Sequence, residues 1–335
     1  MANILPFVSV CTPTFNRRPF FPNIIKCFLM QDYPADRIEW IIIDDGTDKI
    51  GDLVETIPQV KYFAYPEKMY LGKKRNVMHE KSKGDIIIYM DDDDYYPPER
   101  ITHAVEMLQK NPTALCAGSS EMYIYFKHIQ KMYQFGPYGP NHSTAATFAF
   151  RRKLLNYTSY DDNACIAEEK KFLKDYTIPF VQLNPFKTIL VFSHIHNSYD
   201  KKDMLESLNQ YVKLSAKTVD DFVNDSAVKQ FFMHDIDDIL NNYEPGKPIY
   251  KPDVLEQMQQ LIQTRKTKLE QQNQHMQSTE KKLYDQTMTV HKLATENTML
   301  KEKVKYLEEK INQVILDSIQ LKKEAKINNN TNKYI

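Results

Sequence analysis

Four consecutive aspartates, Asp91–Asp94, directly follow the apolar run Ile86–Met90. Carboxylates this close together at the end of a buried strand repel one another strongly, so a cation must offset the cost. Hard oxygen ligands suit Mg²⁺ or Mn²⁺, and such ions commonly bridge a protein carboxylate to a substrate diphosphate. The alternative is a solvated acidic loop, but the clean strand pattern before the aspartates favours a metal site.

Two other polar clusters also follow apolar runs. Asp44 and Asp45 end the second run, and such carboxylates accept hydrogen bonds from ribose hydroxyls or a pyrimidine edge. An ordinary turn is the alternative, because Asp45 precedes a glycine. Thr12, Thr14 and Phe15 end the first run, where they can frame a flat base by stacking and hydrogen bonding.

A basic stretch, Gly72–Asn76, opens a predicted helix. Backbone amides and cations at a helix start suit a diphosphate, although basic residues on a helix are more often a solvated face.

The elements that must position these clusters alternate between strands and helices. Strands are predicted over Phe7–Thr12, Trp40–Ile43, Val60–Ala64 and Asp85–Met90, and helices over Phe20–Gln31, Lys73–Lys81 and Glu99–Lys110. This alternation predicts right-handed βαβ units and a mainly parallel sheet flanked by helices. Ligands bind beyond the carboxyl ends of such strands, so we expect the polar clusters to meet at one edge.

The pattern changes in the second half of the chain. Residues 114–150 favour strands, and a helix near Glu168–Asp175, strands over Phe180–Leu183 and Thr188–Phe192, and helices over residues 201–242 are predicted to follow. After Pro252 the chain contains no proline and no glycine, which indicates a long helix. We therefore place a first domain at residues 1–200, a helical extension at 201–250 and a coiled coil at 251–325, followed by a disordered tail at 326–335.

Heptad spacing supports the coiled coil. The a positions fall every seven residues from Leu255 to Ile311, and the d positions run from Leu293 to Leu321. The register is weak at d in the first half and strong in the second, and the polar Asn297 at a is typical of parallel dimers. A homodimer is expected, and a single helix folded back on the first domain is the alternative.

Composition limits the possible partners. The chain has 335 residues, with 44 basic and 44 acidic ones, so no global positive field points to nucleic acid or to an anionic membrane. Its four cysteines lack pair spacing, which suits a reducing compartment and argues against a zinc site. We find no signal peptide and no apolar run of transmembrane length, and therefore expect a cytoplasmic protein without a transmembrane segment.

Taken in order, the motifs resemble those of one family. The quoted pieces are Val8–Arg17, Ile42–Thr47, Gly72–Asn76, Lys83–Asp85 and Met90–Arg100. Their order and spacing are similar to those of nucleotide-sugar glycosyltransferases with the GT-A fold, in particular family 2. The resemblance covers roughly residues 6 to 198, and it implies a Rossmann-like GT-A domain.

The resemblance also implies roles for the polar clusters. Asp91 and Asp93 would hold Mn²⁺ or Mg²⁺ on the donor diphosphate as the DXD motif, and Asp92 would contact the donor sugar or ribose. Asp44 and Asp45 would hold uracil or ribose, and Arg75 would approach the base or the phosphates.

Family 2 enzymes are generally inverting, and their general base usually lies in an acidic pair that opens a helix. Glu168 and Glu169 occupy that place here, where the family commonly has Glu-Asp. The resemblance favours Glu169 as the base and Glu168 as the second choice, and a negative first helical turn is the alternative. The family often places a histidine near the metal or diphosphate. His194 and His196, at i and i+2 on a strand end, point the same way, so both are candidates, and His196 is preferred.

The resulting prediction is a metal-dependent inverting glycosyltransferase. Its expected donor is a UDP-sugar, and its acceptor a glycan, protein or lipid. Two other hypotheses stay open: an inactive GT-A-like domain on a coiled-coil scaffold, and a sugar-phosphate nucleotidyltransferase. A nucleotidyltransferase would be expected to carry a glycine-rich loop after the first strand. Thr12–Arg17 contains no glycine, which argues against that hypothesis.

Overall fold

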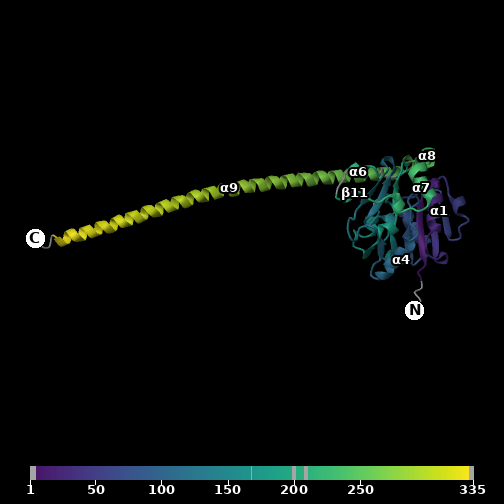
Figure 1. The fold of residues 1–335 in the computed structure, drawn as a ribbon, viewed down its shortest axis with the longest axis horizontal. Helices are drawn as coiled ribbons and strands as arrows, with labels where there is room; N and C mark the ends of the chain where they lie inside the picture. Colours follow the sequence, from purple (N-terminus) through teal and green to yellow (C-terminus); the bar gives the residue numbers. More distant parts are fainter. Residues whose placement is uncertain (1–4, 167, 198–200, 207–209, 332–335) are drawn as a thin grey trace. The chain divides into compact units, whose positions relative to one another are not determined.

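The computed structural model describes residues 5–166, 168–197, 201–206 and 210–331. The chain divides into two compact units, Met1–Leu261 and Ile262–Ile335, and Figure 1 shows its elements along the sequence. The last helix, α9 (Pro252–Thr331), begins in the first unit and continues through the second.

A seven-stranded sheet forms the centre of the first unit, in the order β3-β2-β1-β4-β8-β5-β9. Its strands are β1 (Val8–Thr14), β2 (Ile38–Asp44), β3 (Val60–Ala64), β4 (Ile86–Tyr89), β5 (Cys116–Gly118), β8 (Ala149–Arg151) and β9 (Phe180–Gln182). β3, β2, β1 and β4 are mutually parallel, and only β8 runs antiparallel to its neighbours β4 and β5. The mainly parallel α/β fold predicted from the sequence is confirmed.

The register brings the predicted polar clusters to one edge of this sheet. Thr14 at the end of β1 pairs with Asp44 at the end of β2, and Cys11 pairs with Tyr89 at the end of β4. The strands β2 and β4 are buried along their whole length, as their unbroken apolar runs indicated.

Helices connect and flank the strands. They are α1 (Phe21–Leu29), α2 (Gly51–Val54), α3 (Leu71–Lys81), α4 (Arg100–Lys110), α5 (Glu169–Phe172), α6 (Asp203–Glu206), α7 (Ser226–Gln230) and α8 (Ile236–Asn241), with a π-helical turn at Phe231–Asp235. Short 3₁₀ helices lie at Arg18–Phe20, Ala35–Arg37, Lys127–Ile129, Ala145–Thr147, Arg152–Asn156, Pro185–Lys187, Val219–Asp221, Glu244–Gly246 and Pro248–Tyr250. The helix predicted over Glu168–Asp175 is shorter in the structure, because Lys174, Asp175 and Tyr176 adopt positive φ angles.

A second sheet of four strands has the order β10-β6-β7-β11. Its strands are β6 (Met122–Phe126), β7 (Lys131–Phe135), β10 (Leu190–Ser193) and β11 (Val212–Leu214). The helical prediction over residues 201–242 is wrong at β11. Its two apolar residues alternate and pair antiparallel with β7, which local helical spacing could not indicate.

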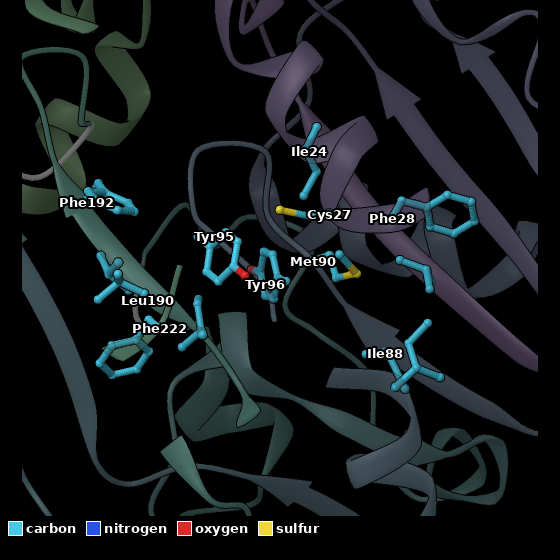
Figure 2. Packing of buried hydrophobic residues seen from close by; sticks show 14 of the residues in the cluster. Ile24, Cys27, Phe28, Ile88, Met90, Tyr95, Tyr96, Leu190, Phe192 and Phe222 are labelled. Carbon is cyan, nitrogen blue, oxygen red and sulfur yellow. The ribbon is translucent and has the colours of Figure 1, made fainter. Parts of the chain in front are cut away.

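Buried side chains between the two sheets support the loop after β4. Figure 2 shows Tyr95 and Tyr96 between Ile24 and Cys27 of α1 on one side and Leu190 and Phe192 of β10 on the other. The backbones of Tyr95 and Leu190 exchange two hydrogen bonds of 3.0 and 2.9 Å. The residues that follow the four aspartates are therefore anchored in the core.

The second unit consists of α9 from Ile262 onward. The tail predicted to be disordered from residue 326 is helical as far as Thr331, since no helix-breaking residue interrupts this stretch, and residues 332–335 lie outside the described ones. Among the helices described, none is sufficiently long and apolar to span a membrane.

His79 is a buried titratable group in the core beneath β4. It is 6% exposed, its Nε2 lies 2.6 Å from the hydroxyl of Tyr89, and its ring packs edge-on against Phe150. Burial, followed by the positive charges of Arg75 and Arg152, lowers the pKa of His79 to about 3.

This shift predicts a measurable loss of stability in acid. Below about pH 6.5 the unfolded chain takes up a proton at His79 that the folded protein does not, so the stabilising contribution is present above that pH and lost as pH falls. Between pH 7.5 and 5.5 the wild type should lose about 1.4 kcal/mol more unfolding free energy than a His79→Gln variant, which lacks the titrating ring. Urea unfolding followed by fluorescence of Trp40, which is fully buried in the first unit, measures both proteins. An equal decrease in the two proteins would contradict the assignment.

Candidate active site

One cavity of about 370 Å³ lies at the carboxyl edge of β1 and β4. Its lining residues come from the strand ends, from the starts of α3 and α9, and from the loop before α5. They are Pro13, Thr14, Phe15, Arg17, Lys68, Met69, Leu71, Lys74, Arg75, Asp91, Asp92, Asp93, Ala145, Ala146, Cys165, Ile166, Glu168, Lys251, Asp253 and Val254. The cavity therefore unites the aspartate cluster, part of the cluster that ends β1, the basic start of α3 and Glu168 of the acidic pair. No residue of the Asp44–Asp48 cluster, which was expected at the same edge, is among the lining residues.

Core residues hold the aspartate loop in place. The backbone N–H of Asp91 donates to the hydroxyl of Tyr96 over 2.7 Å. Arg100, fully buried, donates to the carbonyls of Thr147 and Phe148 over 2.8 and 2.9 Å. The first bond fixes the backbone of Asp91, and the bonds of Arg100 join the start of α4, which follows the aspartate loop, to the segment before β8.

Arg17 and His194 face the same aspartate, Asp93. Arg17 Nη2 lies 3.4 Å from Asp93 Oδ2, Arg17 Nε lies 3.8 Å from Asp92 Oδ1, and His194 Nε2 lies 3.2 Å from Asp93 Oδ2. Burial tends to raise the pKa of Asp93, but the hydrogen bond from His194 and the charge of Arg17 hold it well below its usual range. Burial and the charge of Asp93 raise the pKa of Asp92 to about 7. Asp93 is thus the carboxylate that stays ionised.

Arg75 joins the first aspartate to the acidic pair. Its guanidinium lies 4.5 Å above the ring of Tyr89, Nη1 lies 3.7 Å from Asp91 Oδ1, and Nε donates to Glu168 Oε1 over 3.0 Å. Burial, the charge of Asp93 and that of Glu168 raise the pKa of Asp91, while Arg75 opposes them. Arg75 is therefore a buried cation shared by two carboxylates.

The two glutamates occupy different positions. Glu168 is 7% exposed and lines the cavity. Glu169 is the first residue of α5, is partly exposed, and is not among the residues that line the cavity. The chain enters α5 with Glu168, the second choice from the sequence, turned toward Arg75, whereas Glu169, the first choice, lies outside the cavity lining.

The two histidines are also distinguished. The structure places His194, rather than the preferred His196, next to Asp93. β10 ends at Ser193 and a turn follows, so alternation along a strand no longer relates the two side chains. His196 instead packs near Tyr243, and its Nδ1 is buried without a hydrogen-bond partner among the described residues.

Two residues expected to bind the donor are engaged in the fold itself. Asp44 is 1% exposed and accepts hydrogen bonds from the N–H groups of Gly46 and Ile50 and from the hydroxyl of Tyr62. Thr12 is fully buried, donates to the carbonyl of Met90 and accepts from the indole of Trp40. Neither lines the cavity, because both side chains satisfy polar groups at the strand ends.

Asp45 does not line the cavity but contacts two residues that do, Met69 and Lys74. It is 2% exposed, accepts from the N–H of Met69 over 2.6 Å, and forms an ion pair with Lys74. Lys74 and Met69 line the cavity, whereas Asp45 does not, so this carboxylate positions residues of the site. Thr14 and Phe15, which were expected to frame the base, both line the cavity.

The sequence suggested that the backbone amides at the start of α3 would bind a diphosphate. In the structure this helix start packs against the loop before Glu168. The N–H of Gly72 donates to the carbonyl of Ala164 over 2.8 Å, and an added Cβ at Gly72 would lie 1.9 Å from the carbonyl oxygen of Asp161. Gly72 is required for this close approach of α3 to the loop before Glu168. This helix contributes two cationic side chains to the cavity lining, Lys74 and Arg75.

Sequence reasoning missed several charged residues of the site, among them Arg17 and Lys74. Both stand inside the motifs already singled out, but only the fold shows that each is buried beside an aspartate.

The aspartates suit a hard cation, although they do not form a complete cage. Among the described residues, no group of three or more His, Cys, Asp or Glu side chains is arranged to hold a metal ion. The Oδ1 atom of Asp91 is buried without a hydrogen-bond partner among the described residues. Such an oxygen fits Mg²⁺ or Mn²⁺, which proteins commonly hold with one or two carboxylates plus substrate phosphates.

Comparisons with known proteins point to one family. The profile of "Glycosyl transferase family 2" matches residues 9–175. An uncharacterized glycosyltransferase of Haemophilus influenzae is 29% identical over 120 residues, which cover 34% of this chain and 47% of that protein. A putative teichuronic acid biosynthesis glycosyltransferase, TuaG of Bacillus subtilis, is 29% identical over 34% of this chain and 46% of its own length.

Poly(ribitol-phosphate) beta-N-acetylglucosaminyltransferase TarS of Staphylococcus aureus is 26% identical over 31% of this chain and 19% of its own length. The chain thus spans less than half the length of these curated relatives. A crystal structure of TarS residues 1–349 aligns with a TM-score of 0.46 and 19% identity, over 59% of this chain and 62% of that one. A mannosyltransferase from Pyrobaculum calidifontis, in complex with GDP-Man and Mn²⁺, aligns with a TM-score of 0.45 and 18% identity, over 56% and 57%.

The profile match covers most of the first sheet, the aspartate loop and the acidic pair, and Asp91, Asp93 and Glu168 within it line one cavity. Residues 9–175 are therefore a domain of glycosyl transferase family 2.

Proposed function

We propose that this chain is a metal-dependent, inverting glycosyltransferase that moves a sugar from a nucleotide-sugar to an acceptor hydroxyl. The observation that carries the proposal is the cavity that Asp91, Asp93, Arg75 and Glu168 share. A UDP-sugar is the first candidate donor, as the resemblance implies, and the acceptor belongs to a glycan, protein or lipid. The printed names of TarS and TuaG, which concern poly(ribitol-phosphate) and teichuronic acid, add polymeric acceptors as candidates.

Two buried guanidinium groups support an anionic donor. Arg17 and Arg75 are 5% and 2% exposed, and the Nη1 atom of each lacks a hydrogen-bond partner among the described residues. A buried donor without a partner is costly, and a diphosphate would supply several acceptor oxygens to both side chains. We assign Arg17 and Arg75 to the donor phosphates.

Asp91 and Asp93 are the residues that would hold Mn²⁺ or Mg²⁺. When bound, the ion would neutralise the departing diphosphate. Asp93 supplies a carboxylate that stays ionised, and Asp91 supplies the oxygen that lacks a hydrogen-bond partner among the described residues.

Glu168 is the proposed general base. Its carboxylate would accept the proton of the acceptor hydroxyl while the hydroxyl oxygen attacks the anomeric carbon on the side opposite the diphosphate. The sugar–phosphate bond breaks as the new glycosidic bond forms, so the anomeric configuration inverts. The 3.0 Å hydrogen bond from Arg75 orients Glu168 for this step.

We further propose that the second unit forms a parallel homodimer. Along α9 the heptad positions Leu293, Leu300 and Leu307 are 58%, 63% and 48% exposed in the single chain. A row of such leucines on a long helix is stable in water when a second helix covers it.

Replacing the ionised aspartate tests the metal role. We expect Asp93→Asn to reduce donor hydrolysis and transfer roughly 100- to 1000-fold, because a charge that stabilises the leaving group is lost. Asp94→Asn is the matched control, because burial raises the pKa of the neighbouring Asp94 well above its usual range and the amide resembles its neutral form. A panel of UDP- and GDP-linked sugars, each with Mn²⁺ or with EDTA, measures hydrolysis. Full activity of Asp93→Asn, or of the wild type in EDTA, would refute the metal role.

The two glutamates give a second test. Glu168→Gln should reduce kcat roughly 100- to 10,000-fold, because the amide cannot accept the proton, while thermal shifts with donor are retained. Glu169→Gln should stay within about threefold of the wild type, because Glu169 does not line the cavity. The reverse result would return the base to Glu169.

A lysine in the leucine row tests the dimer. In sedimentation equilibrium the wild type should be a dimer, and Leu300→Lys should be mainly monomeric. A leucine contact worth about 2–5 kcal/mol in the dimer is replaced by a charge. Thr298→Lys adds the same side chain outside the a and d positions and should leave the dimer intact. A monomeric wild type would exclude the proposed assembly.

A further inference from the structure

A lysine from outside the family match reaches the donor cavity. The match ends at residue 175, yet Lys251 is only 9% exposed and lines the same cavity as Asp92 and Asp93. Its carbonyl accepts the first hydrogen bonds of α9, from the N–H groups of Val254 and Leu255, and its own N–H donates to Pro248. The backbone that carries Lys251 is therefore fixed by the start of a helix.

The residues around Lys251, 243–257, are named here the bridging segment. Its first part contacts the loops after β1 and β2: Asn16 donates to the carbonyl of Pro245 over 2.9 Å, and the hydroxyl of Tyr243 donates to Asp48 over 2.9 Å. These contacts span 229 and 195 positions of the sequence, so they bring the bridging segment back to the sheet edge.

The last part of the bridging segment contacts the opposite side of the cavity. Asp253 forms an ion pair with Lys68. Gln257 accepts from the N–H of Cys165 over 2.8 Å and donates to the carbonyl of Asn163 over 2.7 Å. The bridging segment is thus fastened to the loop that leads to Glu168, and Lys251 lies between its two points of attachment.

Three lysines converge on one ring in the cavity. The Nζ atoms of Lys68, Lys74 and Lys251 lie 5.4, 5.9 and 5.9 Å from the ring centroid of Phe15. Lys68 and Lys74 have the carboxylate partners Asp253 and Asp45. Burial, followed by repulsion from Arg17, lowers the pKa of Lys251 to about 7, while the charges of Asp92 and Asp93 oppose this shift. An anionic ligand beside the three lysines would stabilise their positive charges.

We propose that Lys251 binds the phosphates of the nucleotide donor, so that the bridging segment completes the donor site. The inference rests on the proposed function, since it takes a nucleotide-sugar as the donor. A compact ammonium group among Lys74 and Arg17 forms a concentrated positive field, which suits the two adjacent charges of a diphosphate. The donor site therefore extends beyond residues 9–175 into the residues that start α9.

Calorimetric titration of the full chain with UDP and with GDP, each with Mn²⁺, tests this role. Lys251→Met should weaken binding of the nucleoside diphosphate that the wild type prefers by roughly ten- to a hundred-fold, because one charge-assisted contact is lost. Lys251→Arg should restore most of the affinity, which a purely structural role of the side chain would not predict. Lys247→Met is the matched control, since Lys247 belongs to the bridging segment but pairs with Glu244 near the surface.

The outcomes separate the two proposals. If the wild type binds a nucleoside diphosphate and Lys251→Met binds it within about threefold of the wild type, the role of Lys251 is refuted and the proposed function stands. Equal losses in Lys247→Met and Lys251→Met would also refute it, because charge in the cavity would not be the cause. If the wild type binds neither UDP nor GDP, the proposed function falls and this inference with it. Melting temperatures of the variants confirm that each is folded.

Discussion

The carboxylates crowded at the end of β4 are paired with two buried arginines, and the rest of the site depends on this balance of charge. Arg17 faces Asp92 and Asp93, and Arg75 faces Asp91 and Glu168. Both arginines are almost fully buried, so each pair loses its hydration and must be compensated within the protein. Neither arginine is fully satisfied by these carboxylates, since each keeps one Nη1 atom without a hydrogen-bond partner among the described residues. The arrangement that offsets the crowded carboxylates thus leaves guanidinium N–H groups for the anionic donor proposed above.

Support for this balance comes from apolar packing. The aspartate loop is followed at once by Tyr95 and Tyr96, which lie in the core between α1 and β10 (Figure 2). The hydroxyl of Tyr96 accepts the N–H of Asp91, so one aromatic residue both fills the core and sets the first carboxylate. Hydrophobic burial therefore provides the free energy that keeps like charges close together.

Much of the fold follows from local sequence. Strands covered on both faces are unbroken apolar runs, so β2 and β4 were identified within a few residues of their ends. β11 was missed because its pairing with β7 is a tertiary contact, and a three-residue edge strand has no pattern of its own. Polar residues at strand ends were identified as a group, but the sequence did not show which of them reach the cavity. Asp44 and Asp92 occupy similar places in sequence, yet one caps a turn and the other lines the cavity. Lys251 had no sequence signal at all, because only the fold returns residue 251 to the edge of β1.

The attachment of α3 to the loop before Glu168 limits how far Arg75 and Glu168 can move relative to each other. Asn76 and Tyr160 exchange two hydrogen bonds of 3.0 Å, and Gly72 adds a third to Ala164. Arg75 sits on α3 between these two anchoring residues. Arg75, proposed to bind the donor phosphates, and Glu168, the proposed base, therefore stand on two segments that are fastened to each other, so the distance between these side chains is set when the chain folds.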